Sequence, residues 1–185
     1  VVETARRRLT PTGSCARIVL NNAPIGEKEL ERMHLIISGC LLGLRCRYDG
    51  DCRPLPAERI AQLKETWELI PVCPEQLGGL ASPREPSERQ GDRVVSKGGK
   101  DVTGQYVRGA EQTLYLAKLF SCRAALLKEK SPSCGRGSIY DGSFRKRLID
   151  GNGVTADLLL KNGILVFGES QIDDLLAWKE KKAAR

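Results

Sequence analysis

Short apolar runs alternate along this chain with longer stretches in which apolar residues return every three or four positions. The runs, bounded by turn-forming residues, predict strands over 34–38, 68–72, 124–127 and 164–167. The helical spacing predicts helices over 56–66, 103–120 and 154–161, and a last amphipathic helix capped by Ser170. Strands that alternate with helices predict an α/β fold, with a mostly parallel, Rossmann-like sheet between two helical layers.

Two local predictions concern the region between the second and third strands. Segments 93–96 and 100–103, separated by two glycines, read as a small hairpin. The long helix that follows has one apolar face, which we expect to be buried and which consists of Val107, Ala110, Leu114, Ala117 and Phe120.

The length of 185 residues suits one domain with a proper core. Residues 1–33 mix arginines and turn-forming residues with a single apolar patch at 18–20. We therefore expect 1–33 to be an N-terminal extension and 34–185 to form the functional domain.

The formal net charge of +7 is spread along the chain rather than concentrated. Residues 34–169 hold 20 Lys and Arg against 16 Asp and Glu. A diffuse excess of this kind suits an anionic small molecule or a solvated surface better than a nucleic-acid interface. No apolar run reaches the roughly 18 residues of a membrane span, and no signal peptide is evident, so we expect a cytoplasmic protein. Seven cysteines in a reducing compartment indicate metal binding or catalysis rather than disulfides.

Three of these cysteines stand at or just beyond the ends of predicted strands. Cys40 follows the first strand, Cys73 the second and Cys134 the third. Because the carboxyl ends of parallel strands share one edge, where ligand sites form, we expect the three thiols to meet in one crevice.

The number of thiols limits what they can hold. A structural zinc site usually has four ligands, and an iron–sulfur cluster is normally held by four thiolates. Three thiolates would leave one iron open, as a soft Lewis acid that prefers sulfur, whereas zinc stays an alternative. The other cysteines are expected to fill space or to be spare, namely Cys122 in the turn before the third strand, Cys46 and Cys52 in the loop after Cys40, and Cys15 in the extension.

Polar residues near these cysteines are candidates for the chemistry. Glu75, two residues after Cys73, could act as a general base, or it could be an ordinary exposed glutamate. Ser131 and Ser133, on either side of a proline, could orient a substrate or donate a proton. Three arginines could bind an anion or a carbonyl group, or could be surface charges: Arg47, Arg84 and Arg136. The single histidine makes a serine-hydrolase triad improbable, and no glycine-rich nucleotide loop is present.

Several short motifs in a fixed order resemble those of one known family. They are SGCLLG at 38–43, RYDG at 47–50, CPE at 73–75, PR at 83–84, DVT at 101–103 and SPSCG at 131–135. Together, over 34–169, they resemble the thiouracil desulfidases, a family once called domain of unknown function 523.

This resemblance implies a [4Fe-4S] cluster bound by Cys40, Cys73 and Cys134, with the sulfur of the substrate bound to the fourth iron. It also implies that Glu75 is the catalytic acid/base and that Ser131 assists. Water would replace the sulfur of 2-thiouracil, 4-thiouracil or a thiouridine nucleotide without net electron transfer. Some relatives carry a second domain and act on thiolated tRNA, for which this chain has no room, so the resemblance favours a small-molecule substrate. An open iron is sensitive to oxygen, so protein purified in air is expected to lose the cluster or to hold another ion.

Two other functions stay open at this point. In one, the protein is a non-catalytic iron–sulfur or zinc-binding module, and Glu75 is incidental. In the other, a single cysteine carries sulfur as a persulfide, and the enzyme needs no iron.

Overall fold

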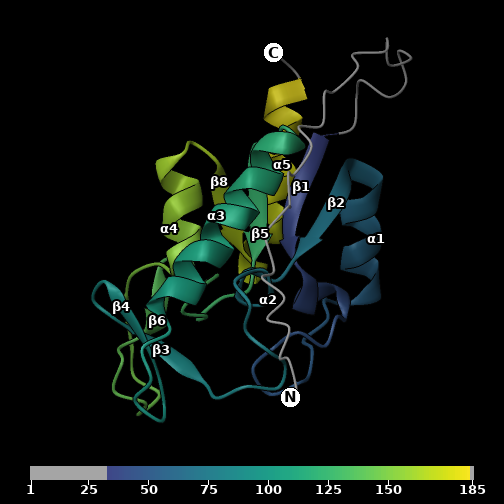
Figure 1. Ribbon diagram of the computed structural model, residues 1–185. Coiled ribbons are helices and arrows are strands. Elements are labelled where there is room, and N and C mark those ends of the chain that lie inside the picture. The colour runs from purple at the N-terminus through teal and green to yellow at the C-terminus, as the bar shows by residue number, and fades with distance from the viewer. Residues whose placement is uncertain (1–32, 184–185) are drawn as a thin grey trace, which may run out of the picture. The chain divides into compact units, whose positions relative to one another are not determined.

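A four-stranded parallel sheet forms the centre of the computed structural model, which describes residues 33–183 (Figure 1). Its strands are β1 (Met33–Ser38), β2 (Trp67–Val72), β5 (Ala124–Leu127) and β8 (Leu165–Gly168), in the order β2-β1-β5-β8. All three pairs of neighbours are parallel, as predicted. The predicted extension, with Cys15, lies outside the described residues except for Met33, with which β1 begins.

Helices cover both faces of the sheet, which confirms the predicted three-layer α/β fold in a single domain. The helices are α1 (Ala57–Thr66), α3 (Thr103–Leu119), α4 (Val154–Lys161) and α5 (Ile172–Ala183). On one face, Leu35 and Ile37 of β1 pack with apolar residues of α1 and α5. On the other, Ile36 packs with residues of α3 and α4. Successive side chains of β1 point to opposite faces of the sheet, so the strand contributes to the core on both sides.

The buried face of α3 differs from the predicted one. Ala110 and Ala117 are buried as expected, but Val107 and Phe120 are 41% and 37% exposed. The face that is buried consists of Tyr106, Gly109, Ala110, Thr113 and Ala117. The prediction was wrong because this face contacts a short helix as well as the sheet, and small residues are required there.

That short helix is α2 (Pro74–Leu77), which the sequence did not indicate. A Cβ at Gly109 would lie 1.8 Å from the carbonyl oxygen of Pro74, and one at Gly78 would lie 2.0 Å from that of Gln105. Both positions therefore require glycine, since only a missing side chain allows the two backbones to approach so closely. This contact fixes α2, which carries Glu75, against α3.

Two further predictions about local structure were wrong or incomplete, and one pair of strands was not predicted. The hairpin pairs β3 (Ser87–Gln90) with β4 (Arg93–Ser96), whereas segment 100–103 contributes only a bridge from Asp101 to Val95. Ser170 lies in a 3-10 turn and donates its hydroxyl to Glu129 instead of capping α5. A second hairpin, β6 (Ser138–Tyr140) with β7 (Leu148–Asp150), was not predicted. The polar sequence of β3 gave no alternation from which a strand could be read.

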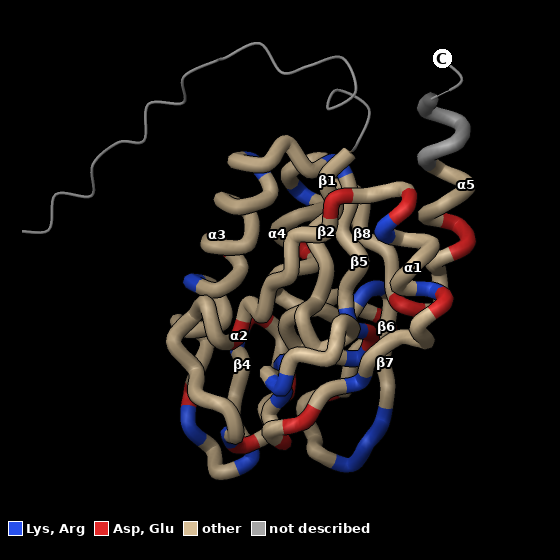
Figure 2. Tube along the Cα trace, turned by 90° about the vertical axis from the view of Figure 1, so that its right-hand side faces the viewer, with Lys and Arg blue, Asp and Glu red and all other residues tan. Residues whose placement is uncertain are grey.

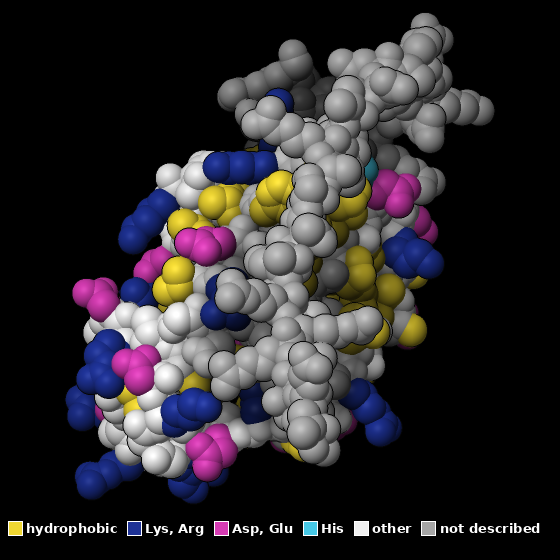
Figure 3. Space-filling view, in the orientation of Figure 1, with side chains coloured by type: hydrophobic (Ala, Val, Ile, Leu, Met, Phe, Trp, Pro, Cys, Tyr) yellow, Lys and Arg dark blue, Asp and Glu magenta, His cyan; other side chains and the backbone are white. Residues whose placement is uncertain are grey.

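Charged residues are frequent in the loops beyond the carboxyl edge of the sheet, below the strands in Figure 2. In Figure 3, Lys, Arg, Asp and Glu side chains gather around the β3–β4 hairpin, while hydrophobic side chains are visible over α3 and α4. No helix within 33–183 is both long enough and apolar enough to cross a membrane.

Candidate active site

The three cysteines at the strand ends line one pocket, of about 390 Å³, at the carboxyl edge of the sheet. Cys40 lies in a 3-10 turn (Gly39–Leu42) directly after β1. Cys73 follows β2 and precedes α2, and Cys134 lies in the loop after β5. Because β2, β1 and β5 are neighbours in the sheet, three segments distant in sequence bring their thiols to the same place.

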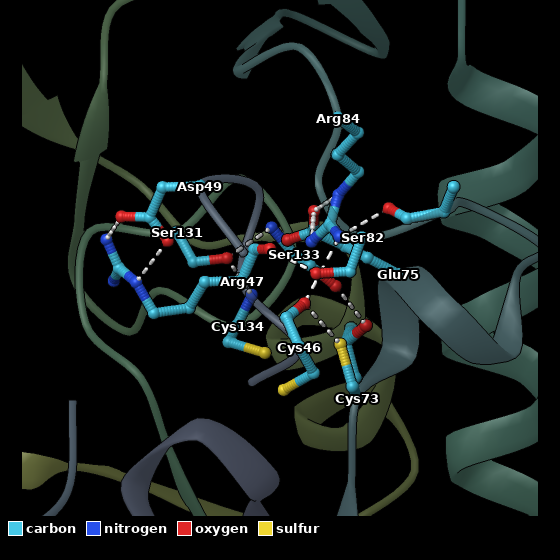
Figure 4. A network of polar contacts seen from close by, with 12 residues as sticks. Cys46, Arg47, Asp49, Cys73, Glu75, Ser82, Arg84, Ser131, Ser133 and Cys134 are labelled. Atoms are coloured by element: carbon cyan, nitrogen blue, oxygen red, sulfur yellow. Dashed lines mark hydrogen bonds and ion pairs between the residues drawn. The ribbon is translucent and has the colours of Figure 1, made fainter. Parts of the chain in front are cut away.

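A fourth thiol, that of Cys46, also lines this pocket. Its side chain is 4% exposed and interacts with the thiols of Cys40 and Cys73. The Cys73 thiol donates a hydrogen bond to the carbonyl oxygen of Cys46 at 3.5 Å (Figure 4). Cys46, which was expected to be spare, thus lies beside the candidate ligands, whereas Cys52 is not among the residues that line the pocket.

Burial favours the protonated form of two of these thiols. The pKa of Cys73 is raised by its hydrogen bond with Cys46 and by burial. Burial raises the pKa of Cys134 to about 12. Buried thiolates need a positive partner, which bound metal ions would provide.

The spacing of the donors bears on the kind of metal site. Within residues 33–183, no three Cys, His, Asp or Glu side chains are grouped closely enough to hold a single metal ion. Cysteine thiolates are the ligands that hold iron–sulfur clusters, and the pocket is lined by several of them. The donor set of the pocket therefore fits the [4Fe-4S] cluster that the resemblance implies.

Glu75 and Arg84 form an ion pair beside the thiols (Figure 4). The guanidinium donates from Nε at 2.9 Å and from Nη2 at 2.6 Å, both to Oε2 of Glu75. The side chains are 13% and 9% exposed, respectively. Tyr106, which also lines the pocket, interacts with Glu75 through its hydroxyl. Arg84, predicted to contact the substrate, thus contacts the predicted acid/base.

Ser131 and Ser133, which were predicted to have the same role, have different surroundings. Oγ of Ser131 lines the pocket and accepts hydrogen bonds from the backbone N–H groups of Ser133 and Cys134, each at 3.1 Å. With both acceptor positions occupied, the hydroxyl proton of Ser131 is free for a further partner. Ser133 is fully buried, and its hydroxyl is hydrogen-bonded to Thr155 at 2.8 Å. Ser133 therefore makes a structural contact and does not line the pocket.

Basic side chains also line the pocket. Arg47 lines it but is paired with Asp49 through two hydrogen bonds. Arg136 is exposed and does not line the pocket. Four lysines also line the pocket. Lys128 is paired with Glu169, whereas the other three form no ion pair with a described residue: Lys97, Lys130 and Lys146.

The sequence reasoning did not identify Tyr106 or these lysines as site residues. For Tyr106, a signal was present, because small residues follow it at helical spacing, at positions 109, 110 and 113. This stripe could have marked a closely packed face. The lysines gave no signal, since they lie in three separate loops of irregular sequence.

Comparison with known proteins agrees with this arrangement. Residues 35–171 match the model of the family described as 2-thiouracil desulfurase. The chain is 41% identical over 152 residues to the uncharacterised protein YbbK of Bacillus subtilis (strain 168), over 77% of this chain and 99% of YbbK.

A solved structure, that of the [4Fe-4S]-dependent thiouracil desulfidase TudS, superimposes with a TM-score of 0.78 at 43% identity. The superposition covers 80% of this chain and 99% of the TudS chain. The match to the family model extends over most of the chain and includes every cysteine that lines the pocket. The chain belongs to the 2-thiouracil desulfurase family.

Proposed function

We propose that this protein is an iron–sulfur-dependent desulfidase that replaces the thiocarbonyl sulfur of a thiolated pyrimidine with the oxygen of water. The reaction converts C=S and H₂O into C=O and H₂S, and it needs neither an oxidant nor a reductant. The observation that carries the proposal is the convergence of three strand-end thiols with Glu75 in one pocket. The family membership and the structural likeness to TudS support the same activity.

Cys40, Cys73 and Cys134 are the residues proposed to hold a [4Fe-4S] cluster. Such a cluster, when bound by three thiolates, supplies an open iron that acts as a soft Lewis acid toward the sulfur of the substrate. The other pocket residues then need only to bind the pyrimidine, orient it and move protons.

Glu75 is proposed as the general base that removes a proton from the attacking water. Both hydrogen bonds from Arg84 reach Oε2, so we assign the proton transfer to Oε1. The same carboxyl group can then return this proton to the departing sulfur and transfer the remaining hydroxyl proton in the same way, so that both protons of the water leave on H₂S as C=O forms.

Ser131 is proposed to donate a hydrogen bond to a ring oxygen or nitrogen of the pyrimidine. The two backbone N–H groups that bond to its Oγ orient the hydroxyl as a donor. A donor held in this way stabilises negative charge that develops on the ring as water attacks.

The substrate class follows from the pocket and its charges. We propose 2-thiouracil, 4-thiouracil or a thiouridine nucleotide, bound as a small molecule. Lys97, Lys130 and Lys146, which line the pocket and form no ion pair with a described residue, favour a substrate with a negative group such as a phosphate. A nucleotide is therefore the better candidate among the three.

The test is sulfide release by protein purified and reconstituted without oxygen. Wild-type protein should convert a thiolated pyrimidine into the oxo form and release one sulfide for each molecule. Glu75→Gln should lower kcat at least about 100-fold, since it removes the base, and should keep its iron. Glu111→Gln, at an exposed position on α3, is the matched control and should keep full activity.

Two results would contradict the proposal. If Glu75→Gln were as active as the wild type, Glu75 would have no part in the mechanism. If an iron-loaded wild-type protein released no sulfide from any of the three substrates, the non-catalytic binding module would become the better account.

A further inference from the structure

We infer that Arg84 is a positioning residue, which acts through Glu75 rather than by contacting the substrate. The inference rests on the proposed function, because it assigns a role relative to the general base. It replaces the sequence-based prediction that Arg84 binds the substrate.

Most of the N–H donors of the Arg84 guanidinium already have acceptors within the protein. Nε and Nη2 donate to Glu75, and Nη1 donates to the carbonyl oxygens of Cys46 at 3.1 Å and Ala81 at 2.9 Å. A guanidinium has five N–H donors in a fixed plane, and four of them are accounted for by these contacts. Little capacity is left for a substrate.

The surroundings of Arg84 hold it in place. Its backbone N–H donates to the carbonyl oxygen of Tyr48 at 2.8 Å. Two residues earlier, the hydroxyl of Ser82 donates to the carbonyl oxygen of Arg47 at 2.8 Å. The loop that carries Arg84 is thus tied to the loop after β1, and the guanidinium cannot swing toward a ligand without breaking several bonds.

Arg84 also connects the base to the thiols. The carbonyl oxygen of Cys46 accepts hydrogen bonds from both Arg84 and the Cys73 thiol. A single guanidinium therefore fixes Glu75 relative to the loop that carries Cys46 and to the strand end that carries Cys73. Such a link keeps the base at a constant place beside the reacting group, which is the geometric requirement for efficient proton transfer.

Tyr106 supports Glu75 from the side of α3. Its side chain is 2% exposed, and its hydroxyl interacts with Glu75 and Ser87. Burial raises the pKa of this phenol, so it stays a neutral hydrogen-bonding group near neutral pH. Tyr106 thus places a neutral phenol beside the Glu75–Arg84 pair, from an element distant in sequence.

The two possible roles of Arg84 predict different kinetics. A residue that binds substrate changes KM and the dissociation constant, whereas one that positions the base changes kcat. A residue that acts only through Glu75 also has no further effect once Glu75 has lost its function.

The experiment compares Arg84→Gln, Arg84→Lys, Glu75→Gln and the Glu75→Gln/Arg84→Gln double variant in reconstituted protein. We expect Arg84→Gln to lower kcat about 10- to 100-fold, with less than about a threefold change in KM. The double variant should be no slower than Glu75→Gln alone. Arg84→Lys keeps the positive charge but lacks the planar guanidinium group, so it should recover part of the kcat lost in Arg84→Gln. This recovery would show that the loss in Arg84→Gln does not come from misfolding. Tyr106→Phe should lower kcat by a smaller factor with KM unchanged.

Two measurements do not depend on turnover. Equilibrium dialysis should give the same dissociation constant for 4-thiouracil with the Glu75→Gln/Arg84→Gln double variant as with Glu75→Gln, because neither variant consumes the ligand at an appreciable rate. The iron and sulfide contents of Arg84→Gln should equal those of the wild type, which would show that its lower kcat does not come from loss of the cluster. Two results would overturn this inference and leave the proposed function standing. One is a dissociation constant raised tenfold when Arg84→Gln is added to Glu75→Gln. The other is a double variant whose kcat is lower than that of Glu75→Gln by the same factor by which Arg84→Gln lowers the wild-type kcat. Absence of sulfide release from iron-loaded wild-type protein would overturn the proposed function and the inference together.

Discussion

Replacement of Gly109 by alanine should impair catalysis from a position that does not line the pocket. A Cβ at this position would lie 1.8 Å from the carbonyl oxygen and 2.7 Å from the carbonyl carbon of Pro74. Both are backbone atoms, which cannot rotate away. The helices α2 and α3 would therefore have to separate by about 1.5 Å before the contact becomes an ordinary van der Waals distance. Since α2 carries Glu75, the base would move with it.

The expected size of the effect follows from this displacement. A shift of about 1 Å in a catalytic group can cost roughly 100-fold in rate, so kcat should fall by about that factor in Gly109→Ala. Overpacking costs about 1–3 kcal/mol of unfolding free energy, partly offset by about 1 kcal/mol from the better helix propensity of alanine. Net destabilisation should thus be modest, so that the lower kcat is measured on folded protein.

The assay is sulfide release together with urea unfolding, with Gly104→Ala as the control. Gly104 lies in the same helix, but a Cβ there would have no heavy atom within 4 Å. This control should keep full activity and equal or slightly greater stability. If Gly109→Ala were as active and as stable as Gly104→Ala, the close contact of α2 with α3 would not fix the position of the base.

Two other predictions concern acid stability and substrate charge. Hydrogen bonds from the Thr103 hydroxyl and N–H and from Arg93 lower the pKa of Asp101 to about 2, against a usual value of 3.8. The stability that this carboxylate contributes is present above about pH 4 and is lost as the pH falls toward 2. The urea midpoint should therefore fall less steeply between about pH 4 and pH 2 in Asp101→Asn than in the wild type. Equal slopes of urea midpoint against pH in the two proteins would contradict this. Lys130→Gln combined with Lys146→Gln should raise KM about tenfold for 4-thiouridine monophosphate and leave KM for 4-thiouracil unchanged, as measured by steady-state kinetics. An equal change for both substrates would exclude a phosphate contact.

The strands and the meeting of the three cysteines were predictable because both follow from simple regularities. Buried parallel strands are continuous apolar runs, and their carboxyl ends share one edge. Knowing that Cys40, Cys73 and Cys134 follow three such runs was therefore enough to place them on the same side of the sheet. The structure confirms that all three line one pocket.

The position of Cys46 could not be predicted in this way. It lies in a loop whose path depends on contacts such as the bond from the N–H of Arg53 to the carbonyl oxygen of Cys40. Irregular loops of this kind have no periodicity from which to infer direction. The partner of Arg84 was missed for the same reason, since Glu75 and Arg84 are brought together by a turn rich in glycine and proline.

The face of α3 illustrates a different limit. Hydrophobic periodicity finds the side that faces a large apolar layer, but here the close approach of α2 selects small residues around Gly109. Val107, an apolar residue, is left exposed as a result. Tertiary packing against a neighbouring helix thus overrode the pattern.

The central claim is that three cysteines hold an iron–sulfur cluster beside Glu75. The most direct test is the iron and acid-labile sulfide content of protein purified and reconstituted without oxygen. We expect about four irons and four sulfides per chain, lost when Cys40, Cys73 or Cys134 is replaced by alanine and retained in the core variant Cys122→Ala. A protein that held one zinc and no iron, or that kept a complete cluster after loss of Cys40, Cys73 or Cys134, would contradict the claim.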